Sequence, residues 1–148
     1  MLRISKLTDY AIMVMVALSD RRGEVVSAQA LAEITHLEAP TVSKVLKLLG
    51  RAGLVQSFRG KNGGYCVDRA AATISVAEII AAIEGPIAMT ECSVERGLCS
   101  QEPVCSLRGN WRRISSAVAE AIEGVSLAEM TLPVGARKPP IQIATWNA

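Results

Sequence analysis

The spacing of apolar residues predicts a chain built mainly of helices. Between Leu7 and Leu18, apolar side chains fall on nearly every face of a helix, and such a helix is buried on nearly all sides. In a chain of 148 residues, this predicts that part of the helix meets a second subunit. The helix is expected to end at Arg21-Arg22-Gly23, because glycine suits the left-handed conformation that follows a helix.

Two short helices joined by a tight turn are predicted next. The first begins after Ser27, whose hydroxyl suits a helix N-cap, and ends near Thr35. The second begins near Pro40, where the missing N–H of proline costs nothing, and ends before Gly53. The residues expected to face inward are Leu31, Ala32 and Ile34 on the first helix and Val42, Val45, Leu46 and Leu49 on the second. This arrangement predicts a helix-turn-helix.

A glycine-rich hairpin and a further helix follow. Leu54 to Phe58 and Tyr65 to Val67 are predicted strands on either side of the basic, glycine-rich residues 59–64. Ser75 then caps a helix over Val76 to Glu84, which a glycine closes. The hairpin after a helix-turn-helix completes the pattern of a winged helix.

Helical periodicity disappears from Ala88 to Ser106 and then returns as a coiled-coil seam. The seam residues, spaced alternately by four and three positions, are Leu107, Trp111, Ile114, Val118, Ala121 and Val125. We therefore expect a mainly α fold with a small β-hairpin wing. Its parts are a winged helix-turn-helix DNA-binding domain over 1–85, a cysteine loop over 86–106, a dimerisation helix over 107–131 and a tail over 132–148.

Charge is segregated along the chain. Residues 39–67 contain five basic and no acidic residues, whereas the rest of the chain carries 11 basic and 14 acidic residues. The acid-free segment spans the second helix of the helix-turn-helix and the hairpin. Such a helix fits the major groove of double-stranded DNA, and a basic hairpin tip can enter the minor groove or bind phosphates. The predicted DNA-binding residues are Thr41, Ser43, Lys44, Lys47, Arg59 and Lys61.

Composition argues against several other functions. Five aromatic residues are too few for a surface that stacks unpaired bases, and no apolar run approaches the roughly 20 residues that span a bilayer. The single histidine, His36, excludes most imidazole acid–base chemistry, and its turn position favours a structural role. We expect a cytoplasmic protein that is not an enzyme and has no membrane partner and no small-molecule substrate.

Three of the four cysteines, Cys92, Cys99 and Cys105, lie where the periodicity is lost. Three thiolates on one loop suit an iron–sulfur cluster or a thiophilic metal, and structural disulfides are rare in the cytosol. The spacing is neither that of a zinc ribbon nor that of a ferredoxin, so three unrelated thiols stay possible from the residues alone. Cys66, on a strand beside Val67, is predicted to be a core residue.

The residues Leu2 to Ala11, Gly53 to Tyr65 and the cysteine loop occur together in one order. In them, the chain resembles the small bacterial winged-helix regulators that sense iron–sulfur status, nitric oxide or redox state, the IscR and NsrR type. The opening most resembles regulators of the SUF iron–sulfur assembly operon. The resemblance implies a repressor of iron–sulfur cluster assembly genes that binds a double-stranded DNA operator as a homodimer through the 107–125 helix. It also implies control by a [2Fe-2S] or [4Fe-4S] cluster.

The resemblance also implies roles for single residues. Cys92, Cys99 and Cys105 match the cluster ligands, and Arg59 matches the wing arginine that enters the minor groove. Where IscR-like members have a histidine ligand, this chain has Arg108.

The fourth ligand must then come from elsewhere. Asp9 is the first candidate, because NsrR-like members supply a matching aspartate from the second subunit, although a carboxylate is also favoured there by the helix dipole. Glu91, Glu95 and Glu102 are weaker candidates, and a water or a small thiol is a further alternative. The alternative function keeps the fold and uses the three cysteines as a thiol redox switch, a nitric oxide sensor or a zinc site.

Overall fold

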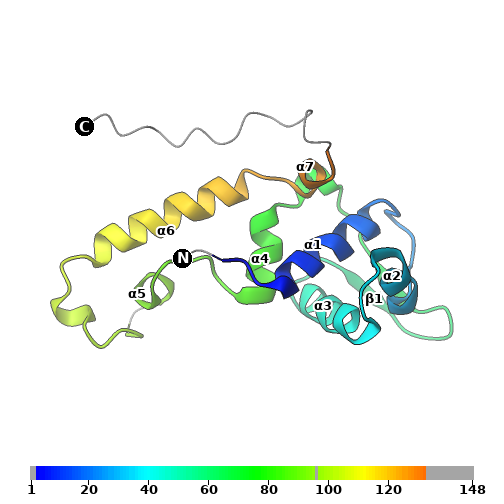
Figure 1. Cartoon of the computed structure of the whole chain (residues 1–148), viewed down its shortest axis with the longest axis horizontal. Coiled ribbons are helices and arrows are strands. Elements are labelled where there is room, and N and C mark those ends of the chain that lie inside the picture. The colour runs from blue at the N-terminus through cyan, green and yellow to red at the C-terminus, as the bar shows by residue number, and fades with distance from the viewer. Residues whose placement is uncertain (1–2, 96, 133–148) are drawn as a thin grey trace.

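The computed structural model describes residues 3–95 and 97–132. Its elements, with η marking 3-10 helices, are α1 (Lys6–Ser19), α2 (Ala28–Thr35), α3 (Ala39–Arg51), β1 (Gln56–Phe58), β2 (Gly64–Cys66), η1 (Ala71–Thr73), α4 (Val76–Glu84), α5 (Glu91–Val94), η2 (Glu102–Val104), α6 (Arg108–Glu123) and α7 (Leu127–Thr131). The helices α1 to α4 and α7 pack into one body, and α6 extends away from it with α5 alongside (Figure 1). The predicted fold, mainly helical with a β-hairpin, is confirmed.

Serine is the N-cap of α1, α2, α4 and α7, because its hydroxyl accepts a hydrogen bond from an otherwise unpaired N–H of the first turn. At Ser75 and Ser126, a glutamate three residues later also bonds back to the serine N–H, which completes a capping box. His36 ends α2 with φ 55°, so its structural role in the left-handed region is confirmed.

An aliphatic core holds the body together. All four residues of the predicted α3 stripe, Val42, Val45, Leu46 and Leu49, are fully buried. Ile34 was expected to face inward, but it is exposed. The inward face of α2 is set by Leu31 and Thr35, one turn apart, and Ile34 lies beside that face on a shallow surface groove.

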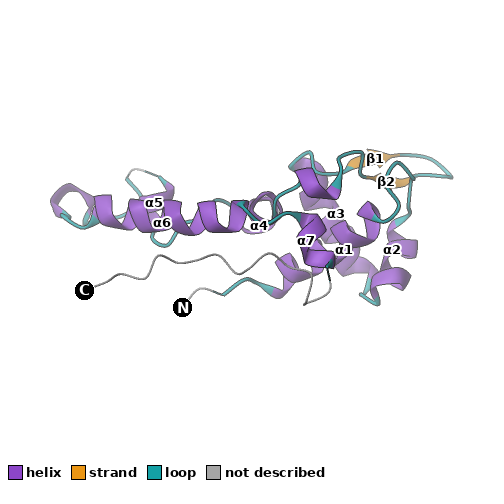
Figure 2. Ribbon diagram, turned by 90° about the horizontal axis from the view of Figure 1, so that it is seen from above, coloured by secondary structure: helices purple, strands orange, loops and turns teal. Residues whose placement is uncertain are grey.

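Close backbone packing fixes the hairpin against the body. Strands β1 and β2 pair antiparallel with Ser57 opposite Tyr65, and Tyr65 also bridges to Val26 before α2. A Cβ on Gly64 would lie 2.4 Å from the Val26 carbonyl oxygen, which only glycine avoids. The two-stranded hairpin (Figure 2) is therefore joined at its base to the chain before α2 by a single β-bridge.

A hydrogen-bond network ties the end of α4 to the start of α1. Glu84 Oε1 accepts the Ser5 N–H at 2.9 Å and also accepts the Thr8 hydroxyl. The Thr8 hydroxyl and then the Ser5 N–H lower the pKa of Glu84.

The segment after the cysteine loop forms two helices with different surroundings. Of the α6 residues only Ser115 is buried, whereas Leu127 on α7 is fully buried in the core of the body. The residues between these helices pair with the start of α4, through Val76 N–H to Val125 O and Leu127 N–H to Ile74 O, both 2.8 Å. None of the helices in the described part of the chain is long and apolar enough to cross a bilayer.

Candidate functional site

Helix α3 presents its polar side chains to solvent because its apolar stripe is fully buried. Ser43, Lys44 and Lys47 are exposed along the outer face, while Thr41 in the first turn is half-buried. Arg51, at the end of the same helix, is also exposed. No acidic side chain lies within α3, so this face carries only positive charge.

The hairpin extends this basic surface. Arg59 and Lys61 are exposed on the turn beyond β1, and Gly60, with φ 111°, allows the chain to reverse there. A hollow lined by Lys47, Arg51, Ser57 and Tyr65 lies between α3 and the hairpin. The structure thus places all six predicted DNA-binding residues on α3 and the hairpin turn, and their role stays a prediction.

Arg51 and Tyr65, which line the hollow together with Lys47, are not among the six predicted DNA-binding residues. Arg51 carried a usable signal, since it belongs to the acid-free segment and lies off the buried stripe of α3. Tyr65 carried none, because its position depends on the strand register.

The cysteine loop lies at the opposite end of the molecule from the hairpin turn (Figure 1). It was expected to lack regular structure, but it contains the short helical segments α5 and η2. Cys92, on α5, is buried with its Sγ 3.3 Å from the Thr90 hydroxyl, while Cys99 and Cys105 are half-buried. All three are free thiols.

The structure does not gather these thiols into a metal site. Within residues 3–95 and 97–132, no group of three or more histidine, cysteine, aspartate or glutamate side chains is placed to hold a metal ion. The ligand assignment therefore stays a prediction, and binding a shared group would require the loop to draw its sulfurs together.

Arg108 occupies the first position of α6 and faces the loop. Its Nη2 lies 3.1 Å from Glu102 Oε1, and its buried Nε–H has no hydrogen-bond acceptor among the described residues. A buried donor without an acceptor is costly. Three thiols and a spare guanidinium N–H on one loop fit, by their chemistry, an anionic group held by thiolates.

Asp9 and Cys66 belong to other parts of the fold, on α1 and β2. Asp9 is exposed in the first turn of α1, on the groove that Ile34 also lines. Cys66 is buried at the end of β2, where burial and then Asp68 raise the pKa of its thiol. The prediction that Cys66 is a core residue is confirmed.

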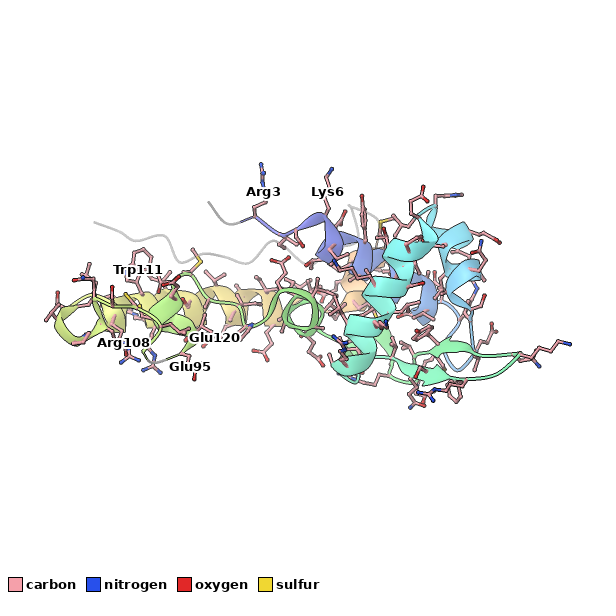
Figure 3. The ribbon with its side chains drawn as sticks, turned by 90° about the horizontal axis from the view of Figure 1, so that it is seen from below. Arg3, Lys6, Glu95, Arg108, Trp111 and Glu120 are labelled. Carbon is pink, nitrogen blue, oxygen red and sulfur yellow. The ribbon has the colours of Figure 1, made fainter. Side chains whose placement is uncertain are left out.

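The first half of the predicted seam is uncovered in the single chain. Leu107, Trp111 and Ile114 are 55%, 37% and 44% exposed. Trp111 projects from α6 beside the cysteine loop (Figure 3). Large apolar side chains grouped on one helix in this way mark an interaction surface.

Comparison with known proteins gives consistent matches. A family model described as "Rrf2: Iron-dependent Transcriptional regulator" matches residues 4–132. The HTH-type transcriptional regulator NsrR of Bacillus licheniformis is 26% identical over 133 residues, covering 88% of this chain and 93% of that protein. IscR of Xenorhabdus nematophila, also an HTH-type transcriptional regulator, is 32% identical over 134 residues, covering 87% and 79%. The solved structure of CymR, described as the global cysteine regulator of Bacillus subtilis, shares 30% identity and a TM-score of 0.65, covering 88% and 96%.

Proposed function

The chain belongs to the Rrf2 family of transcription regulators, and we propose that it binds double-stranded DNA as a homodimer with an affinity set by Cys92, Cys99 and Cys105. The observation that carries the DNA-binding part is the set of exposed basic residues on α3 and the hairpin turn, within a segment, residues 39–67, that contains no acidic residue. Helix α3 enters the major groove, and Arg59 reaches the adjacent minor groove or its phosphates.

The DNA-binding proposal is tested with Arg59→Ala and, as a matched control, Arg112→Ala on α6, where the arginine is also exposed. The probe is a duplex selected by the wild-type protein from a random library. Arg59→Ala should weaken binding and reduce the log–log salt slope by about 0.9 if one phosphate contact is lost. The Arg112 variant should bind as the wild type does. Equal affinities of all three proteins would reject the role of the wing.

The exposed apolar residues of α6 support the dimer. A second copy of the same helix would cover Leu107, Trp111 and Ile114 and bury them. Ile114→Asp should shift sedimentation towards the monomer and weaken DNA binding, because a two-fold operator needs both reading heads. Ser116→Asp introduces the same charge at an exposed position off the seam and should stay dimeric.

We propose an iron–sulfur cluster, [2Fe-2S] or [4Fe-4S], as the group that the three thiolates hold, with the partner subunit's Asp9 as the fourth ligand. Support comes from the donor set and from the family's description as iron-dependent. When bound, such a cluster supplies a redox- and nitric oxide-sensitive group. The regulator would then act as a repressor of iron–sulfur assembly genes, with cluster and DNA binding coupled by about 1 to 3 kcal/mol.

Iron and acid-labile sulfide, measured after anaerobic purification, test the cluster. The triple alanine variant at the three loop cysteines should lose both, and full iron retention in that variant would reject the ligand assignment. Asp9→Ala should make the cluster more labile, whereas Asp20→Ala, at an exposed aspartate after the other end of α1, should not.

A second candidate function uses the same free thiols without a cluster. A thiol switch or a zinc site would use the same residues, and CymR, to which the chain is similar, is described as a cysteine regulator. Stoichiometric zinc without sulfide, or metal-free protein with a reversible disulfide that alters DNA affinity, would establish this candidate instead of the cluster.

A further inference from the structure

Glu102 and Arg108 form a mostly buried ion pair inside the cysteine loop. Arg108 Nη2 lies 3.1 Å from Glu102 Oε1, and the two side chains are only 22% and 14% exposed. The other carboxylate oxygen of Glu102, Oε2, accepts the Gly97 N–H at 2.6 Å. Glu102 therefore joins the turn at Gly97, where φ is 87°, to the first residue of α6.

The backbone of Glu102 connects the two cysteines on either side of it. Its N–H donates to the Cys99 carbonyl at 3.1 Å, and its own carbonyl accepts the Cys105 N–H at 3.4 Å. Fixing the Glu102 side chain therefore restricts both cysteine backbones. Charge-assisted hydrogen bonds such as those of this carboxylate are stronger than neutral ones, so the side chain can hold the turn.

We propose that Glu102 is the positioning residue for Cys99 and Cys105 and that Arg108 holds Glu102 in place. Both carboxylate oxygens of Glu102 are then used by Gly97 and Arg108, so Glu102 is not a ligand of the group that the thiols hold. Cys92 is not held by Glu102, because its side-chain contact is with the Thr90 hydroxyl, on the N-terminal side of Gly97. The loop thus contains one clamped pair of cysteines and one cysteine held separately.

The inference rests on the proposed function only in treating the loop cysteines as the functional thiols. Its test uses the full-length, reduced, metal-free protein without DNA, so a failure here leaves the DNA and iron measurements unaffected. The rate of alkylation by iodoacetamide is followed at each cysteine by peptide mass spectrometry. The variants are Glu102→Ala, Glu102→Gln and Arg108→Met, with Glu95→Ala as the control at an exposed glutamate of the same loop.

Loss of the clamp should accelerate alkylation of Cys99 and Cys105 about tenfold in both Glu102→Ala and Arg108→Met, because local opening exposes the half-buried thiols. Cys66 and Cys92 should keep their wild-type rates, and Glu95→Ala should change none. A purely electrostatic effect gives a different result, since removing an anion and removing a cation would change thiolate reactivity in opposite directions.

Opposite effects of the two variants, or unchanged rates at Cys99 and Cys105, would overturn the proposal. If Glu102→Ala also accelerates Cys66, that variant has lost its fold, and Glu102→Gln decides. The glutamine keeps an oxygen for the Gly97 N–H but loses the ion pair, so its rates should lie between those of the wild type and of Arg108→Met. Wild-type rates in a folded Glu102→Gln protein would count against the clamp.

Discussion

Leu127→Ala tests whether α7 is a structural part of the body formed by α1 to α4. Leu127 is fully buried, and α7 packs against α1 and η1. Buried Leu→Ala changes cost about 2 to 5 kcal/mol, and a five-residue helix can relax partly into the space left. We therefore expect a loss of about 3 kcal/mol in the free energy of unfolding, or about 6 to 12 °C in Tm for a chain of this size.

The measurement is urea unfolding followed by far-ultraviolet circular dichroism. Protein concentration must be the same for every variant, because the stability of a dimer depends on it. Met130→Ala is the control, since Met130 lies on the same helix but is 40% exposed. A loss below about 0.5 kcal/mol, the usual range of surface changes, or a loss no greater than that of Met130→Ala would refute the packing argument.

Three further changes have defined outcomes. Glu84 has a lowered pKa, so its contribution to stability is present above its unfolded pKa of about 4.3 and is lost as pH falls through the folded value. In Glu84→Gln, the urea midpoint should therefore fall less at acid pH than in the wild type, and an equal fall would contradict this. Gly64→Ala should lower Tm through its backbone clash, whereas Gly109→Ala, which meets nothing within 4 Å, should not. Ser115→Ala removes the oxygen that accepts the Met89 N–H at 3.0 Å, so hydrogen exchange of the Met89 amide should be faster. Protection of that amide equal to the wild type would contradict this.

Local patterns predicted most of the helices because their causes are local. The α3 stripe follows from four apolar positions at helical spacing, and the serine caps follow from the chemistry of an unpaired N–H. Ile34 shows where periodicity fails, because a short helix offers too few turns to define one inward face. The groove that it lines depends on Met13 and Met130, which belong to distant parts of the sequence.

The cysteine loop was predictable in composition but not in arrangement. Counting thiols identified Cys92, Cys99 and Cys105, yet the backbone around them is set by α5, η2 and the hydrogen bonds of Glu102. Glu102 looked like one acidic residue among several on a polar stretch. Its distinguishing feature is its contact with Arg108 and Gly97, which sequence spacing does not encode.

The β-bridge between Ser75 and Ser126, with its two flanking hydrogen bonds, connects α6 to the body that carries α3, the helix proposed to bind DNA. Helix α6 has 16 residues and is about 24 Å long, so a shift of about 2 Å at its loop end tilts it by about 5°. At its other end, the two flanking hydrogen bonds of 2.8 Å hold the chain to the start of α4, which packs against α1 and α3. The cysteine loop is therefore connected to the body that carries α3 through α6 and hydrogen-bonded backbone.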